Sequence, residues 1–128
     1  MDDFDSLLSY LEASKTSVQI ATVKGVKKAG MLIQSDAKRL APVDTGRLRN
    51  SIAVEAEETA AGAVAEVGSN VIYAPYVEYG TGQRGDPSVD HRQDWLGTPP
   101  HPFLRPAAEY NRENCAIVIG EEVKKVLK

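Results

Sequence analysis

The sequence predicts an α+β fold, in which a small antiparallel β-sheet packs against a long helix of the N-terminal half and a C-terminal helix, with a long flexible loop. Both ends of the chain repeat apolar residues every three or four positions, which is the period of a helix. Between them, apolar and polar residues alternate as in a half-buried strand. A length of 128 residues suits a single domain, which we expect to span residues 1–128.

The N-terminal half predicts two helices, over residues 1–16 and 17–41. In the first, the early aspartates suit the positive end of the helix dipole. Pro42 should end the second, because proline lacks the backbone donor that a helix needs. The apolar residues of the two helices fall at helical spacings: Phe4, Leu7, Leu8 and Leu11, then Val23, Val26, Gly30, Ile33, Ala37 and Leu40.

Residues 50–79 form the predicted sheet region. Ile52, Val54 and Ala56 alternate with polar or small residues, and the stretch 63–67 repeats the pattern. The polar segment 57–62 between them predicts an antiparallel hairpin with a longer loop. The next apolar run, 71–79, contains Pro75, so it is an edge strand, an interrupted strand or a short helical turn.

Residues 80–102 are dense in Gly, Pro and Asp and have no apolar period. A structureless loop of this length is either functional or disordered, and we expect a mobile arm that partner subunits order. The last helix is predicted over 103–128. It begins at the proline-framed Phe103 and Leu104, which we expect to be buried and to pin the arm to the body.

Composition excludes several classes of protein. The net charge of −3 argues against a protein that coats nucleic acid. No stretch approaches the ~18 apolar residues of a membrane span, and the acidic N-terminus does not resemble a secretory signal, so a soluble protein is expected. The single Cys115 excludes an internal disulfide, and we expect it to pack as a small hydrophobe.

No catalytic, cofactor or metal site is predicted. Gly80–Gly85 matches the dinucleotide fingerprint GxGxxG, but Asp86 and Pro87 follow where that motif needs a helix. The polar loop residues fit no metal-ligand spacing, and no nucleophile motif is present, so we do not expect an enzyme. The metal-ligand types in question are Asp86, Asp90, His91, Asp94 and His101.

Three stretches carry a family resemblance: APVDTGRLRNSI at 41–52, YAPYVEYGTG at 73–82 and PHPFLRPA at 100–107. Together they resemble the neck or tail-completion (head–tail joining) morphogenesis proteins of tailed bacteriophages, the gene-ten product type of lambdoid phages. The order and spacing of the stretches and the chain length are similar to that family, across roughly residues 17–127.

The resemblance implies a non-enzymatic structural protein that forms a ring between the capsid portal and the tail. It implies further copies of the chain and neighbouring head-closure and tail proteins as partners, with DNA only as passing cargo in a central channel. No cofactor and no membrane are implied. The chain would be part of the virion, assembled in the cytoplasm of the bacterial host.

The interface candidates come from the same stretches and from the loop: Arg47, Arg49, Tyr76, Glu78, Tyr79 and Trp95. Because Arg47 and Arg49 alternate with Leu48, we expect them opposite the core, where they pair with Glu78, pair with a neighbouring subunit or are solvated. Trp95 is either an interface anchor or a cover for its own core. The motif residues expected to shape the fold are Pro42, Asp44, Gly46, Phe103, Leu104 and Pro106.

Charge is uneven along the chain. Residues 15–49 carry a sum of +6, and the first hairpin is acidic. Such a subunit can pair head to tail with its own copies, or the charges can simply be solvated. The alternative function is a small DNA-binding or nuclease-inhibiting module that uses the basic second helix. The net acidity and the lack of aromatic residues among the lysines weigh against it.

Overall fold

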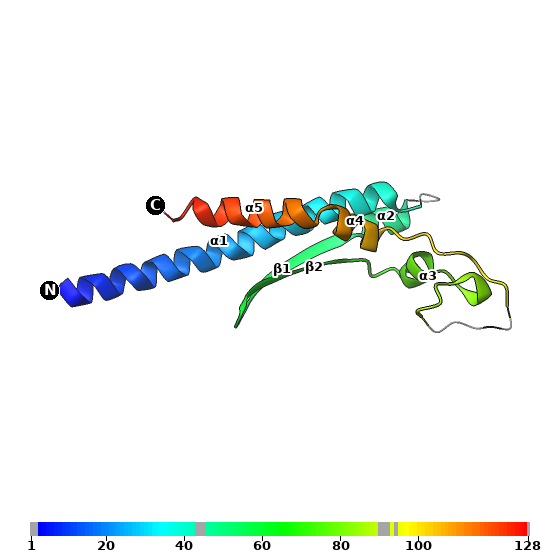
Figure 1. The fold of residues 1–128 in the computed structure, drawn as a ribbon, viewed down its shortest axis with the longest axis horizontal. Coiled ribbons are helices and arrows are strands. Elements are labelled where there is room, and N and C mark those ends of the chain that lie inside the picture. Colours follow the sequence, from blue (N-terminus) through cyan, green and yellow to red (C-terminus); the bar gives the residue numbers. More distant parts are fainter. Residues whose placement is uncertain (1–2, 43–45, 90–92, 94, 128) are drawn as a thin grey trace. The chain divides into compact units, whose positions relative to one another are not determined.

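The structure, a computed structural model, describes residues 3–42, 46–89, 93 and 95–127. It confirms the α+β fold class, with a long N-terminal helix, a two-stranded antiparallel sheet and a C-terminal helix (Figure 1). The elements in chain order are α1 (Asp3–Leu40), α2 (Arg47–Ser51), β1 (Ala53–Thr59), β2 (Gly62–Gly68), α3 (Ala74–Tyr79), the 3-10 turn η1 (Gly82–Arg84), α4 (Leu104–Tyr110) and α5 (Arg112–Lys124).

The chain divides into two compact units. The first unit comprises residues 1–31, 54–66 and 112–128, and the second comprises 32–53 and 67–111. Helix α1 and both strands contribute residues to each unit. The expectation of a single domain over 1–128 therefore stays a prediction.

Helix α1 is continuous, which corrects the expectation of separate helices over 1–16 and 17–41. The polar stretch 14–17 between them contains neither Gly nor Pro, so nothing in it breaks a helix. The Thr16 hydroxyl donates to the Glu12 carbonyl at 3.1 Å, which satisfies this side chain within the helix. The helix ends at Leu40, two residues before Pro42, as the sequence predicts.

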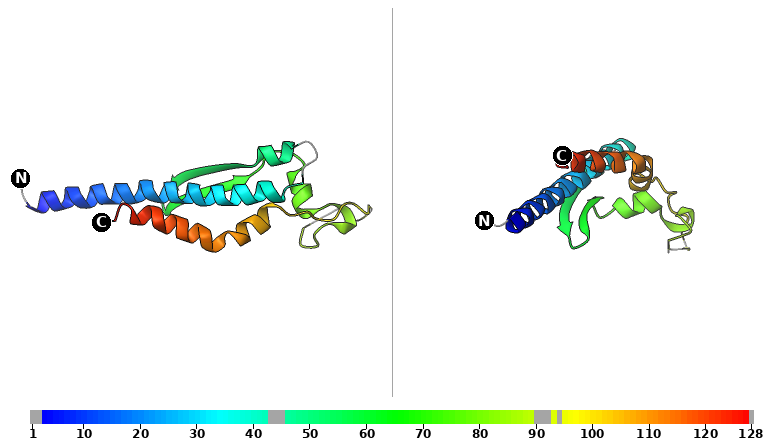
Figure 2. Two further views of the ribbon diagram at one scale, coloured as in Figure 1. Left: turned by 90° about the horizontal axis from the view of Figure 1, so that it is seen from above. Right: turned by 60° about the vertical axis from the view of Figure 1, so that its left-hand side comes forward.

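In the first unit, small residues let α5 approach α1 closely. Figure 2 shows α5 along one side of α1 and the β1–β2 hairpin along the other. A Cβ added at Gly25 would lie 3.0 Å from the Cα of Ile119, so glycine permits this contact. The thiol of Cys115 lies 3.6 Å from the Ala29 carbonyl oxygen, and burial raises the pKa of Cys115. Cys115 thus packs between the helices.

Glu122 joins the same two helices by charge. Its buried carboxylate accepts a hydrogen bond from Lys28 of α1 and one from Lys125 at 2.9 Å, and the Lys24 ammonium lies 3.9 Å away. The hydrogen bonds from Lys28 and then Lys125 lower the pKa of Glu122 to about 2. The ionised carboxylate is therefore the form that the folded state favours.

The hairpin follows the predicted face pattern. Val54 and Ala56 are half-buried, whereas Ala53 and Glu55 are exposed, as the alternation predicts. The strands extend further than expected, because β1 continues to Thr59 and β2 begins at Gly62. The connection is thus shorter than the predicted loop over 57–62.

Residues 47–51 form the helix α2, where the sequence predicts an alternating strand from residue 50. Gly46 precedes this helix with φ +79°, in the left-handed region that glycine adopts without strain. The Asn50 amide then donates to the Gly46 carbonyl at 2.9 Å and closes the turn. Leu48 is buried and the flanking arginines are exposed, so their exposure is as expected although the backbone is helical.

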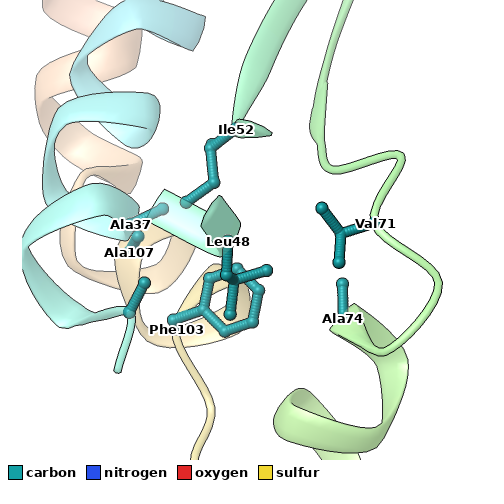
Figure 3. Close-up of a cluster of buried hydrophobic side chains, with 8 residues drawn as sticks. Ala37, Leu48, Ile52, Val71, Ala74, Phe103 and Ala107 are labelled. Carbon is teal, nitrogen blue, oxygen red and sulfur yellow. The ribbon is translucent and has the colours of Figure 1, made fainter. Parts of the chain in front are cut away.

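The core of the second unit gathers around Phe103, whose exposed fraction is 0% (Figure 3). The other buried residues of this cluster come from α1, α2, the positions directly after these two helices, the segment after β2, α3 and α4: Ala37, Ala41, Leu48, Ile52, Val71, Ala74 and Ala107. Leu104 is partly buried against this cluster. Of the alternatives for residues 71–79, the short helical turn is the one observed, as α3.

The C-terminal segment is broken at Asn111 into α4 and α5, where one helix over 103–128 was expected. The Asn111 side-chain amide donates to the Ala107 carbonyl at 2.8 Å and to Asp36 of α1 at 2.7 Å. Its backbone leaves the helical region, with φ −94° and ψ 7°. Asparagine side chains that compete in this way for backbone partners interrupt helices.

Replacement of Phe103 tests the core of the second unit. We expect Phe103→Ala to lower the free energy of unfolding by about 3–5 kcal/mol, because it opens a cavity at a fully enclosed site. Because Leu104 is only partly buried, Leu104→Ala should lower the free energy of unfolding by less. Urea denaturation measures both, with the exposed Tyr110→Ala as a control that should change stability by about 0.5 kcal/mol or less. A loss at Phe103 equal to that of the control would contradict this core.

Acidification tests the Glu122 ion pairs. Because its pKa is about 2 in the folded chain and 4.5 ordinarily, its stabilising effect is complete above pH 4.5 and is lost as the pH falls toward 2. The wild-type urea midpoint should therefore fall across this range, and Glu122→Gln should flatten that fall. The exposed neighbour Glu121→Gln serves as the control. An unchanged pH dependence in Glu122→Gln would show that these pairs contribute nothing.

Candidate functional site

A buried carboxylate of α3 holds the start of α4. Glu78 Oε2 accepts the backbone N–H groups of Phe103 at 2.8 Å and of Leu104 at 3.0 Å, and Oε1 accepts that of Arg105 at 2.9 Å. These are amides of the first turn of α4, which have no acceptor within their own helix. A negative charge is also favourable at this end of the helix dipole. Glu78 therefore fixes α3 against α4.

The same helix presents aromatic side chains outward. Ala74 and Glu78 are one turn apart and buried, whereas Tyr73, Tyr76 and Tyr79, spaced by three residues, are exposed on the other side. Tyr76 is 60% exposed, and Ile72 just before the helix is exposed as well. We call Tyr73, Tyr76 and Tyr79 the tyrosine face. Their three-residue spacing was the signal for this face, and it also includes Tyr73, which the sequence candidates omitted.

Of the two arginine candidates, Arg47 lies at one edge of the tyrosine face. The guanidinium of Arg47 stands over the ring of Tyr73, 5.9 Å from its centroid, which is a cation–π geometry. Arg49 is exposed on the same short helix. Glu78 is buried, and both of its carboxylate oxygens accept amides of α4. Of the three alternatives for Arg47 and Arg49, pairing with Glu78 is therefore the one that these contacts do not favour.

The loop 80–102 is closed at its base by backbone hydrogen bonds, which the sequence did not predict. Thr81 and Thr98 exchange both N–H···O bonds, at 2.8 and 3.1 Å. The Gln83 amide donates to the Trp95 carbonyl at 2.9 Å and the Arg84 amide to the Leu96 carbonyl at 3.0 Å. The loop thus has ordered structure in its described part, and its expected mobility stays a prediction.

Two glycines of the GxGxxG match let the two chain segments cross closely at the base of the loop. Gly80 and Gly82 have φ +75° and +61°, and side chains there would collide with the backbone of Thr98 and Trp95 respectively. Gly97, outside the match, has φ +71° and approaches the backbone of Thr81 in the same way. No helix that could receive a phosphate begins after the match, because η1 ends at Arg84 and a turn follows. The motif therefore reflects close backbone packing.

Trp95 stands on the outside of the second unit. Its side chain is 53% exposed, and the adjacent Leu96 is equally exposed. This exposure favours the interface alternative for Trp95, which stays a prediction, over the alternative in which Trp95 covers its own core. Its backbone is nevertheless fixed by the bond from Gln83, so the indole projects from an anchored segment.

Asp86 has an internal structural role. Its carboxylate accepts the amide and hydroxyl of Ser88 at 2.9 and 2.7 Å and lies 3.5 Å from the Arg105 guanidinium. These contacts, the Ser88 amide first, lower the pKa of Asp86. Asp90, His91 and Asp94 lie outside the described residues. Within the residues that the structure describes, no group of three His, Cys, Asp or Glu side chains could hold a metal ion.

The motif residues are placed as follows. Pro42 is exposed after the end of α1. Gly46 is the N-cap residue of α2, and Phe103 is the N-cap residue of α4, with its side chain in the core. Pro106 is half-buried within the first turn of α4, where proline is tolerated. Asp44 lies outside the described residues.

A second charged surface lies in the first unit. Along the hairpin, a groove of about 420 Å³ is lined by Glu55, Glu57 and Glu66 with Lys27 of α1, over a floor that includes Val54 and Val64. Glu58 is exposed beyond it on β1. We call Glu55, Glu57, Glu58 and Glu66 the acidic hairpin.

Comparison with known protein families finds a match to a family of bacteriophage proteins. The model of the family described as "Bacteriophage HK97-gp10, putative tail-component" matches residues 5–80, which is more than half of the chain. The match includes α1, the hairpin and the tyrosine face. Comparisons with curated proteins and with solved structures find no significant match. In the described residues, no helix is long and apolar enough to cross a membrane.

Replacement of Glu78 tests whether the carboxylate sets the tyrosine face. Glu78→Gln keeps the size but turns one acceptor into a donor against a buried amide, so we expect a loss of about 1–3 kcal/mol in the free energy of unfolding. The exposed Glu109→Gln in α4 is the matched control. Urea denaturation measures both variants. Equal stability of the two would show that the α3–α4 contact does not depend on this charge.

Proposed function

Because the chain belongs to the bacteriophage tail-component family that its residues 5–80 match, we propose that it is a structural morphogenesis protein of the virion and, more narrowly, the neck or tail-completion component of the gene-ten type. In this role it forms a homo-oligomeric ring that joins head and tail around the DNA channel. Neighbouring head-closure and tail proteins contact the ring, and DNA passes through it as cargo. Assembly takes place in the host cytoplasm.

The observation that carries the proposal is the tyrosine face. Tyrosines supply rigid contact area with one polar atom each, and they are enriched at the centres of protein interfaces. Here they stand on a helix that Glu78 fixes to the core, so little flexibility is lost when a partner binds. Trp95 and Leu96 add apolar area on an anchored segment of the same unit.

Charge favours contacts between copies of the chain. Arg47 and Arg49 are exposed in the second unit, and the acidic hairpin is exposed in the first. A contact between the arginines of one copy and the acidic hairpin of the next is heterologous, and such contacts close into a ring when the rotation permits. Complementary charge also sets the orientation in which the copies meet.

The alternative, a DNA-binding or nuclease-inhibiting module built on the basic part of α1, receives less support. Lys24 and Lys28 lie beside Glu122, and Arg39 pairs with Asp36 at 3.3 Å. Lys27 lines the groove of the acidic hairpin. A surface for the DNA backbone needs a continuous row of exposed cations, whereas each of these cations has a carboxylate beside it.

Charge reversal of Arg47 and Arg49 tests the proposal. The variant Arg47→Glu/Arg49→Glu should melt close to the wild type, because exposed charges typically contribute under ~1 kcal/mol. It should nevertheless fail to restore joined particles in a phage that lacks this gene, since like charges would then meet at the contact. Complementation and a thermal melt measure the two effects.

The control is the exposed Arg112→Glu, which should complement normally. The reciprocal change Glu55→Lys/Glu57→Lys should restore particles only in combination with the arginine variant. A normal particle yield from the arginine variant would show that Arg47 and Arg49 do not take part in the contact between copies. A collapsed melt would instead assign them to the intramolecular framework.

A further inference from the structure

The first turns of α1 carry an apolar stripe that their own unit leaves exposed. Leu7 and Leu11 are 53% and 52% exposed, and Leu8 between them is exposed too. None of the residues 3–20 is buried, and the first buried residue of α1 is Ala21. Figure 1 and Figure 2 show the reason, since the first part of α1 extends beyond the C-terminal end of α5.

The stripe continues the face by which α1 packs on α5. From Leu7 and Leu11, steps of three and four residues lead through Ser14 and Val18 to Ala21, Gly25 and Ala29. Gly25 and Ala29 contact α5 at Ile119 and Cys115. One helical face is thus covered in its second half and exposed in its first. An exposed amphipathic helix end of this kind is typical of a segment that packs into a groove on a partner.

The same unit contains a groove of suitable chemistry. Between α1 and α5, a hollow of about 260 Å³ has apolar walls from Ile20, Ala21 and Val126. Ile20 is 65% exposed, and Val126 and Leu127 are exposed as well. The groove therefore leaves apolar side chains in water, as the stripe does.

Charges on the two surfaces are complementary. The stripe is flanked by Asp3, Asp5 and Glu12 against a single Lys15. The groove is bordered by Lys24 and Lys125, with Lys28 nearby, against the single Glu122. An acidic helix end and a basic groove attract each other, whereas two copies of either surface repel.

We propose that the first turns of α1 of one copy pack their apolar stripe into the α1–α5 groove of the next copy. A single kind of contact then covers both apolar surfaces of the first unit and places acidic beside basic residues. The contact is heterologous, because each copy contributes a different surface. It rests on the proposed self-assembly but uses neither the tyrosine face nor the arginines.

Two complementary variants test this contact. Leu7→Glu/Leu11→Glu removes the stripe and Ile20→Glu/Val126→Glu removes the groove, all at exposed positions. Both variants are made in an Arg47→Glu/Arg49→Glu background, which removes the proposed arginine contact. In that background, each purified variant alone should sediment as a monomer, where the parent forms larger species. An equimolar mixture should form heterodimers and nothing larger, because one intact stripe and one intact groove remain. Ser6→Glu/Ser9→Glu, on the exposed remainder of the same helix, is the matched control and should assemble as the wild type.

Cross-linking decides between this contact and a pairing of two stripes. With Cys115→Ser as background, Leu11→Cys/Val126→Cys treated with a bismaleimide should give a ladder of multimers. Leu11→Cys alone should give no dimer. A dimer from Leu11→Cys alone, a monomeric wild type, or a mixture without heterodimers would overturn the proposal. These sedimentation and cross-linking results do not depend on the result of the arginine test. Complementation in the phage tests the proposed function, whereas these experiments test only the contact between the stripe and the groove.

Discussion

The orientation of the tyrosine face on the second unit depends on one buried carboxylate. Glu78 accepts the first three amides of α4 and thereby holds α3, and with it the tyrosines, in one orientation. The charge is stable in this place because a helix N-terminus supplies both the hydrogen-bond donors and the favourable end of the dipole. Phe103, whose amide is one of these donors, fills the core directly below. The tyrosine face and the core are therefore connected through one residue, so a force applied to α3 would act directly on Phe103.

The first unit is organised differently, by close backbone approach and buried charge. Gly25 lets α5 lie against α1. Glu122 of α5 then forms ion pairs with Lys28 of α1 and with Lys125. Its apolar interior is small, and many of its large apolar side chains are exposed, among them Leu11, Ile20 and Ile117. Folding of this unit therefore removes little apolar surface from water, and hydrophobic burial contributes correspondingly little to its stability.

Periodic features were predictable from the sequence, and features set by tertiary partners were not. The end of α1 before Pro42, the inward residues of the hairpin and the burial of Phe103 follow from local patterns. Helix α2 has only five residues, too few for a helical period to appear, so its sequence resembled alternation. The break at Asn111 depends on Asp36, which is 75 positions away in the chain. Glu78 was named as a candidate for its charge, but only the fold shows that its partners are backbone amides of its own chain.

At the base of the loop 80–102, two chain segments cross and are held together by backbone hydrogen bonds. Thr81 and Thr98 bond to each other through main-chain atoms, and Gly82 and Gly97 keep the two segments close, so the positions at the crossing tolerate little change. Among the described residues that the crossing encloses, Asp86 contacts Arg105 of α4. Residues inserted between the two crossing segments would leave the backbone bonds of the crossing intact, so the loop is a suitable place for grafting a foreign peptide.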